Sequence, residues 1–251
     1  MKADKTNFNA ANFGSMSTFT MLNHKDHVAS KKRIGHAYSM KRMRAFESEI
    51  DLRLKELVGV LTKTAMKGVT IDSLYHLQQA GSETTSLNVA LAVFHIARNP
   101  DVKHRLQNEL DHAEQTGKIP PRTAMISYDQ ALELPFLTAC IRESLRYTPS
   151  VAQIPRKAPP DTGLNLHGRH IPPGTSVSTS AWIVGRDTNL YGEDSNTFRP
   201  ARWLEASEDK LRKMDKFDFV FGYGARRCLG RHVASIQLWK SIAEVCYLMP
   251  P

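Results

Sequence analysis

Residues 221–230 restrict the possible folds of this chain more than any other segment. They read Phe-Gly-Tyr-Gly-Ala-Arg-Arg-Cys-Leu-Gly, which places one cysteine in a loop of glycines and arginines directly before a run of helical character. A cysteine thiolate can be a nucleophile or a metal ligand, and both arginines and the first turn of a helix favour the thiolate form. Gly224 and Gly230 allow turns and a close backbone approach that a Cβ atom would block. The segment therefore predicts a loop against which a flat cofactor lies, with Cys228 as its reactive group.

The remaining cysteines and the charge of the chain narrow its class. The cysteines at positions 140, 228 and 246 do not form the pattern of a disulfide framework, which fits a reducing compartment, and Cys140 is expected to be buried in an apolar helix. The net charge is +9, and residues 1–67 hold 13 Lys or Arg against 6 Asp or Glu. Such a basic surface could meet nucleic acid, anionic lipid or an acidic protein. Because the sequence has no zinc spacing, aromatic RNA-binding motif or arginine-rich arm, no nucleic-acid partner is expected.

Apolar periodicity predicts a mainly α fold with a small β-sheet region. Residues 1–20 are polar and are expected to be disordered. Residues 21–148 read as helical, because apolar residues recur at helical spacing and Gly or Pro interrupts the pattern at intervals. The expected helices are residues 24–40, 41–66, 71–98, 101–115 and 134–147.

The character of the sequence changes at Pro149. Residues 149–184 combine Pro and Gly with short β-prone runs, which predicts a small sheet of hairpins. Residues 185–227 are expected to form an irregular meander that ends in the cysteine loop, and residues 228–248 a final helix. No run approaches the ~20 apolar residues that span a membrane, and the N-terminus has no signal-peptide core. The sequence thus predicts a cytoplasmic location or a peripheral one at the endoplasmic reticulum membrane.

The pattern Phe221-x-x-Gly224-x-Arg226-x-Cys228-x-Gly230 resembles the haem-binding signature of the cytochrome P450 family, the haem-thiolate monooxygenases. The resemblance implies a haem (heme) cofactor with Cys228 as the axial thiolate ligand of its iron, a ligand that favours cleavage of the O–O bond. It also implies that Arg226 pairs with a haem propionate and that Phe221 shields the sulfur from water. The alternative is a buried structural cysteine beside a surface pair of arginines.

A second match lies in the helix before the sheet. Glu143 and Arg146 form the sequence Glu-x-x-Arg and share a helix face, which on its own is a common surface ion pair. In the family the matching pair is buried on the cysteine side of the haem and is joined by a downstream arginine. The sequence Phe-Arg-Pro-Ala-Arg-Trp at residues 198–203 resembles that downstream segment, with Arg202 as the third member. It departs from the common form by carrying Ala201 where an acidic residue usually stands. The resemblance gives the three residues a structural role, which is to hold the cysteine loop.

A third match is Ala-Gly-Ser-Glu-Thr-Thr at residues 80–85, in the middle of an expected long helix. Gly and Thr are poor residues for a helix interior, and the plain alternative is a helix with a local kink. The segment resembles the oxygen-activation motif of the family. The resemblance implies that Gly81 opens a groove for dioxygen, that Thr84 donates a hydrogen bond to the oxygen, and that Glu83 relays protons inward.

Three further residues are expected to face haem propionates. Arg156, in Ile-Pro-Arg, resembles the arginine that follows the Glu-x-x-Arg helix in the family. His27 and Lys31 stand where the family often has Trp-x-x-x-Arg, and both can still donate to a carboxylate. For His27, a surface histidine is the alternative.

The resemblance covers residues 20–248 but not the whole family fold. Members are usually far longer, and the N-terminal region, the helices that roof the pocket and the C-terminal strands have no counterparts in this sequence. We therefore expect one partial, truncated cytochrome P450 domain over residues 1–251, a shortened or alternatively spliced member or an imperfect gene model. Apolar surface left in water costs roughly 25 cal/mol per Å², so a partial pocket weakens haem binding.

The function implied by the resemblance is insertion of one oxygen atom from dioxygen into a small organic substrate, with electrons from an NADPH-dependent reductase. A basic surface on the cysteine side is expected to receive that reductase. It consists of Arg227, Arg231, Lys210, Arg212 and Lys213. Residues 181–187 look most like fungal members, which favours secondary-metabolite biosynthesis. The competing hypothesis is a non-catalytic remnant that binds haem weakly or not at all.

Overall fold

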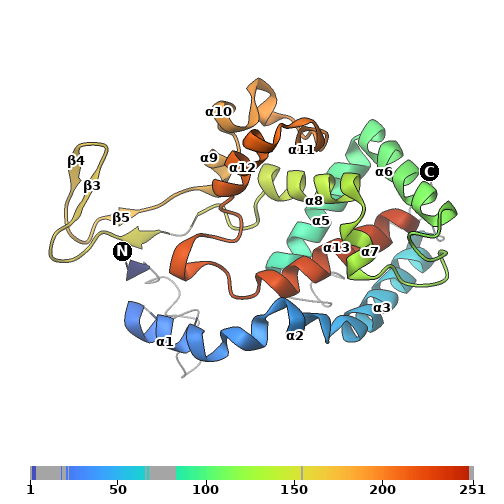
Figure 1. The fold of residues 1–251 in the computed structure, drawn as a ribbon, viewed down its shortest axis with the longest axis horizontal. Helices are drawn as coiled ribbons and strands as arrows, with labels where there is room; N and C mark the ends of the chain where they lie inside the picture. Colours follow the sequence, from blue (N-terminus) through green and yellow to red (C-terminus); the bar gives the residue numbers. More distant parts are fainter. Residues whose placement is uncertain are drawn as a thin grey trace.

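The computed structural model of this 251-residue chain describes residues 2–3, 18, 21, 23–65, 67, 83–153 and 155–248. A helical body carries a small antiparallel sheet region at one end (Figure 1). The hairpin of β3 (Leu164–Leu166) and β4 (Arg169–Ile171) lies at that end, and α6 (Pro100–Gln115) lies at the other. The expected mainly α fold with a small β region is confirmed.

The first helices of the described chain are shorter than the sequence predicts. α1 (His24–Ile34) begins after Asn23, whose side-chain oxygen accepts a hydrogen bond from Lys25 N at 2.9 Å, and it continues as the 3-10 turn η2 (Gly35–Tyr38). The expected helix 41–66 is two helices, α2 (Met40–Arg44) and α3 (Glu47–Ala65), separated by a turn. This turn lets both helices contact the final helix, so packing has overridden a continuous helical pattern.

Five helices build the main core. They are α5 (Glu83–Arg98), α6, α7 (Tyr128–Leu132), α8 (Pro135–Tyr147) and α13 (Arg231–Leu248). α13 packs against α5, α6, α7 and α8, and α5 also packs against α6 and α8. The sequence predicted α6 and α8 to within one residue at each end, with Pro135 at the first helical position. Residues 71–82 of the expected long helix lie outside the described residues.

The apolar side of the helix that we expected at residues 41–66 faces this core. Leu54 and Leu57 are buried in α3, and Leu61 packs against them from a partly buried position. Cys140 is fully buried in the same cluster, as the sequence predicts. Within the described part of the chain, no helix has the length and apolar character needed to cross a bilayer.

The sheet region has two parts. β2 (Arg156–Lys157) pairs antiparallel with β5 (Ser176–Val177) on one side and with β1 (Lys2–Ala3) on the other. The hairpin β3–β4 turns at His167 and Gly168, which both have positive φ (49° and 77°), as two-residue hairpins require. The expectation of disorder for residues 1–20 is wrong for residues 2–3, because pairing with β2 gives them a fixed register.

Short helices occupy much of the segment that we expected to be irregular. They are α9 (Ala181–Val184), α10 (Thr188–Tyr191), η3 (Glu193–Asn196), α11 (Arg202–Glu205), α12 (Glu208–Lys216) and η4 (Gly224–Arg226). Ser180 caps α9 through a hydrogen bond from Ile183 N, and Asp187 caps α10 through Asn189 N at 2.8 Å. The final helix α13 begins at Arg231, three residues later than expected.

A buried lysine joins three helices near the end of the core. Lys240 of α13 is fully buried, and its Nζ lies 2.8 Å from Glu47 Oε1 and 2.7 Å from Asp51 Oδ1, both on α3. The same Nζ donates to Ile126 O at 2.7 Å, just before α7. Glu47 Oε1 also accepts from Tyr128 N at 2.7 Å. Because a buried ammonium is costly unless it is paired, these contacts fix α3 and α7 on α13.

Replacing Lys240 should therefore lower the stability of the fold. We expect Lys240→Met to lower the free energy of unfolding by roughly 3 kcal/mol, because two carboxylates lose their buried partner. Urea denaturation followed by circular dichroism measures this change. Lys213→Met, at an exposed position on α12, is the matched control and should change the midpoint little. Equal midpoints for the two variants would contradict this account of the lysine.

Candidate functional site

The cysteine loop has a defined backbone in the structure. Cys228 N donates to Phe221 O at 2.7 Å, and Arg227 N donates to Gly224 O at 3.0 Å, which closes the loop over η4. Gly224 has φ of +65°, a conformation that favours glycine, whereas a Cβ there would meet no atom within 4 Å. Glycine at 224 is therefore explained by conformation and not by crowding.

The cysteine side chain is accessible at this loop. Cys228 is exposed, in contrast to the buried Cys140 and Cys246. A Cβ on Gly230 would lie 3.9 Å from Cys228 Sγ, so the glycine leaves the space beside the sulfur open. Phe221 packs against the main core from a partly buried position. The alternative of a buried structural cysteine does not agree with this exposure.

Two arginines expected at haem propionates lie near each other. Arg226 Nη1 donates to Met21 O at 2.9 Å, ahead of α1. Burial and the neighbouring Arg156 guanidinium both lower the pKa of Arg226. Arg156 comes from β2, so the sheet and the cysteine loop meet at this pair. Two guanidiniums that repel each other form a suitable place for an anionic group, and haem carries two carboxylates.

The remaining two residues expected at propionates lie on α1. Lys31 Nζ donates to Ala225 O at 2.9 Å and also to Arg227 O, so it contacts the cysteine loop directly. Burial and the nearby cations of the loop lower the pKa of Lys31. His27, one turn earlier, is buried, which contradicts its interpretation as a surface histidine. Lys31 and Arg226 thus join α1 to the cysteine loop, and Arg156 lies near Arg226, a group of cations that fits the propionates of a haem.

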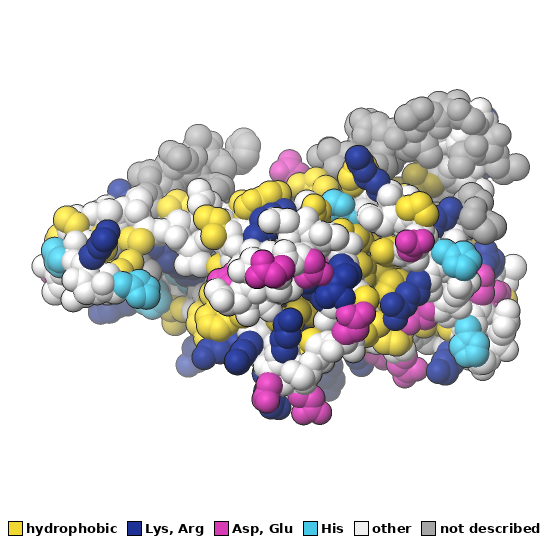
Figure 2. Space-filling model, turned by 90° about the horizontal axis from the view of Figure 1, so that it is seen from above, with side chains coloured by type: hydrophobic (Ala, Val, Ile, Leu, Met, Phe, Trp, Pro, Cys, Tyr) yellow, Lys and Arg dark blue, Asp and Glu magenta, His cyan; other side chains and the backbone are white. Residues whose placement is uncertain are grey.

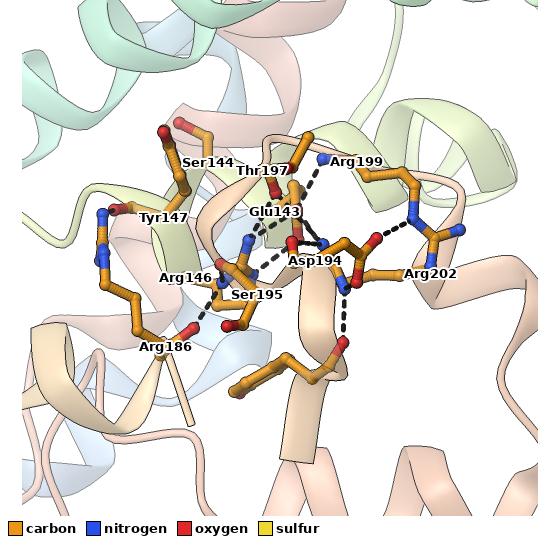
Figure 3. Close-up of polar contacts among 12 residues, drawn as sticks. Glu143, Ser144, Arg146, Tyr147, Arg186, Asp194, Ser195, Thr197, Arg199 and Arg202 are labelled. Atoms are coloured by element: carbon orange, nitrogen blue, oxygen red, sulfur yellow. Dashed lines mark hydrogen bonds and ion pairs between the residues drawn. The ribbon is translucent and has the colours of Figure 1, made fainter. Parts of the chain in front are cut away.

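The Glu143, Arg146 and Arg202 side chains form one buried network (Figure 3). Glu143 is fully buried on α8, and its Oε1 accepts from Arg146 Nη2 at 2.7 Å and from Arg202 Nε at 3.0 Å. Its Oε2 accepts from Arg146 Nε at 2.8 Å and from Trp203 Nε1 at 3.0 Å. Arg199 N adds a fifth hydrogen bond at 2.8 Å. Burial rules out the common surface ion pair that we weighed for Glu143 and Arg146.

The two buried guanidiniums hold the irregular segment through its carbonyl groups. Arg146 donates to the carbonyls of Gly185, Ser195 and Thr197. Arg202 donates to Tyr191 O at 2.6 Å, to Asp194 O at 2.9 Å and to Thr197 O at 3.1 Å. Because this segment has no strand ladder, the arginines supply the partners that its carbonyls need.

Asp194 supplies the second negative charge of the network, and sequence reasoning missed it. Its Oδ1 lies 2.9 Å from Arg202 Nη1, and its Oδ2 lies 2.5 Å from Arg199 Nε. With Glu143, it balances the charges of Arg146 and Arg202. An acid is thus provided from residue 194, although Ala201 stands at the usual acidic position. No local pattern marks Asp194, because its partners are five and eight residues away in a turn.

The residues expected at the oxygen groove lie at the start of the described part of α5. Glu83 and Thr84 are both exposed, whereas Thr85 and Ser86 are buried. Asn88, one turn further, donates to Ser150 Oγ at 3.0 Å and so connects α5 to the chain after α8. Gly81 lies outside the described residues. α5 packs on α13, the helix that follows the cysteine loop.

A buried histidine, also missed from the sequence, joins α5 to the arginine network. His95 stacks on Phe198 with ring centroids 5.0 Å apart and hydrogen-bonds Thr148 Oγ1 at 3.0 Å. Burial lowers the pKa of His95, which favours the neutral ring. Phe198 belongs to the segment that carries Arg202, so α5 is linked by packing to the network on the cysteine side.

A pocket of about 320 Å³ lies beside the cysteine loop, among α8, α9, α13 and residues 215–221. Its wall includes Arg146, Trp203, Phe221, Arg227 and Trp239. Phe221, which the resemblance places beside the ligand sulfur, and Arg227, next to Cys228, belong to this wall, whereas Cys228, Thr84 and Arg156 do not.

The basic residues expected to receive a reductase are not equivalent in the structure. Arg212 of α12 is paired with Asp209 and, at 3.7 Å, with Glu208. Arg227 and Arg231 line the pocket beside the loop. Figure 2 shows acidic and basic side chains interspersed on the face that carries α10–α12.

The charge balance of the arginine network can be tested at Asp194. Burial opposes its ionisation, but hydrogen bonds from Arg202 and Arg199 outweigh it and lower the pKa of Asp194 below 3.8. Its stabilising contribution is therefore present above pH 3.8 and is lost as the pH falls below that value. We expect Asp194→Asn to lower the free energy of unfolding at pH 7 by about 1 kcal/mol, because Asp194 is partly exposed.

Urea titrations at pH 7 and at pH 3.5 measure this difference. The difference in the free energy of unfolding between the wild-type protein and Asp194→Asn should be smaller at the lower pH. Asp209→Asn, an exposed acid that pairs with Arg212 on α12, is the control and should have little effect. A larger difference in the free energy of unfolding at pH 3.5 than at pH 7 would contradict the lowered pKa of Asp194.

Comparison with known proteins shows the family of this chain. The sequence model of the cytochrome P450 family matches residues 72–245. Cytochrome P450 monooxygenase ustC of Aspergillus flavus is 48% identical over 250 residues, which cover 98% of this chain and 61% of that protein. Cytochrome P450 monooxygenase ACRTS1 of Alternaria alternata is 38% identical over 167 residues, 66% of this chain and 43% of that protein. The chain thus spans less than two thirds of the curated relatives named here. With a family match over more than half of its length, the chain belongs to the cytochrome P450 family.

Proposed function

We propose that this chain carries the thiolate side of a haem-thiolate monooxygenase, which inserts one oxygen atom from dioxygen into a small organic substrate. The observation that carries the proposal is the exposed Cys228 on a closed loop, which Lys31 contacts and which carries Arg226 near Arg156. An exposed thiol among cations suits a thiolate ligand. The relatives named above are fungal, and we extend the proposal to secondary-metabolite biosynthesis.

Haem bound at this site would supply the redox chemistry that activates dioxygen. Cys228 presents the ligand sulfur, and Phe221, packed against the core beside it, limits the access of water. Arg156 and Arg226 would hold the propionates by charge-assisted hydrogen bonds. The Thr84 hydroxyl would donate a hydrogen bond to the oxygen. The adjacent Glu83 carboxyl is exposed and would therefore deliver protons from solvent.

The electrons come, in this proposal, from an NADPH-dependent reductase that binds the cysteine side. The pairing of Arg212 with Asp209 leaves Arg227 and Arg231, with the exposed Lys210 and Lys213, as the cations that an acidic partner would meet. Charge complementarity of this kind raises association rates at low salt.

A second candidate is a family member that does not retain haem. The exposure of both Glu83 and Thr84 favours it, because oxygen activation needs a site from which water is excluded. The two candidates differ in the spectrum of the purified protein.

The test is the carbon monoxide difference spectrum of the reduced chain after reconstitution with haemin. The proposed function predicts a Soret band at the wavelength for which the family is named. Cys228→Ser should abolish that band, and Cys246→Ala, a buried cysteine in α13, should retain it. A band at the position of a neutral axial ligand in the wild-type protein, or no haem uptake, would reject the monooxygenase, and no uptake would support the second candidate.

A further inference from the structure

Two cations that the sequence analysis assigned to haem propionates, Lys31 and Arg226, donate hydrogen bonds to backbone carbonyls. Lys31 Nζ reaches from the last turn of α1 to the carbonyls of Ala225 and Arg227. Arg226 Nη1 reaches in the opposite direction, from the cysteine loop to Met21 O before α1. The contact between α1 and the loop is therefore reciprocal and joins residues about 200 positions apart in the sequence.

The position of the Lys31 ammonium is specific to the loop. Ala225 and Arg227 flank Arg226, and the Arg227 carbonyl belongs to the peptide group that joins it to Cys228. One Nζ atom that bonds both carbonyls fixes the peptide group between Ala225 and Arg226 and the peptide group between Arg227 and Cys228. The loop itself supplies few bonds of this kind, chiefly Cys228 N to Phe221 O and Arg227 N to Gly224 O.

We propose that Lys31 is a positioning residue that holds the cysteine loop in its ligand-presenting conformation before haem binds. This proposal rests on the proposed function, because a ligand-presenting conformation requires Cys228 to be the haem ligand. The ordering of the loop by Lys31 does not require haem. A loop ordered in advance presents its ligand without an entropic cost at the moment of binding.

The competing role for Lys31 is a direct bond to a propionate. In that case the lysine acts only when haem is present, and the haem-free loop does not depend on it. The two roles therefore predict different behaviour of the haem-free protein, and this difference makes the proposal testable without activity.

The experiment is hydrogen–deuterium exchange of the full haem-free chain, followed on peptides that cover residues 221–230. Exchange in α6 is the internal reference for global stability. We expect Lys31→Ala to raise the ratio of loop exchange to α6 exchange by roughly tenfold, because a hydrogen bond to a charged group is lost. Lys31→Arg keeps donors at this position and should restore much of the protection.

Lys32→Ala is the matched control, because Lys32 is the next residue of α1 and is exposed. This variant should leave the ratio of loop exchange to α6 exchange unchanged. A ratio in Lys31→Ala equal to that of the wild-type protein would overturn the proposal. If that variant also bound haemin more weakly, Lys31 would be assigned to a propionate. Loss of the thiolate Soret band in the wild-type protein would refute the proposed function and would leave the exchange result intact.

Discussion

The carboxylate of Glu143 is the interaction on which the arrangement of the cysteine side depends. It is fully buried and accepts five hydrogen bonds from the side chains of Arg146, Arg202 and Trp203 and from the backbone of Arg199. A buried charge is costly unless its partners satisfy it, so this geometry allows little variation. In turn, the two arginines are held in place with their remaining donors directed at carbonyls of residues 185–197. One residue of α8 thereby orders a segment that has no ladder of its own.

This order extends to the loop that carries Cys228. The segment after the network runs through α12 into the loop, and α13 follows it and packs back on α8. Arg142 of α8 pairs with Asp215 at the end of α12 and lies over the Trp203 ring, with its guanidinium carbon 4.0 Å from the ring centre. The loop is thus held from one side by the α8 network and from the other by Lys31 of α1. Both supports are polar contacts between distant parts of the chain.

Local patterns in the sequence were sufficient for much of this structure. α6 and α8 were predictable because apolar periodicity agrees with Pro at the first helical position of each, with Gly117 after α6 and with Pro149 after α8. The loop at residues 221–230 and the Glu143, Arg146 and Arg202 set could be found because their spacing is distinctive. The short helices α9, α10 and α11 were not predictable from periodicity, because four residues are less than two helical turns and side-chain caps and the buried arginines define them. Asp194 and the backbone bonds of Lys31 depend on tertiary contacts that no local pattern encodes.

The central claim is that the charge of Glu143 holds residues 185–205. Hydrogen–deuterium exchange of Glu143→Gln tests it most directly, with Glu109→Gln as the control. Glu109 is a partly buried carboxyl that also contacts α8, but it accepts from Phe136 N and Leu137 N, both at 2.8 Å, at the opposite end of the helix. We expect faster exchange over residues 185–205 in Glu143→Gln alone, since the neutral amide cannot balance two guanidiniums. Wild-type protection of this segment in Glu143→Gln would contradict the claim.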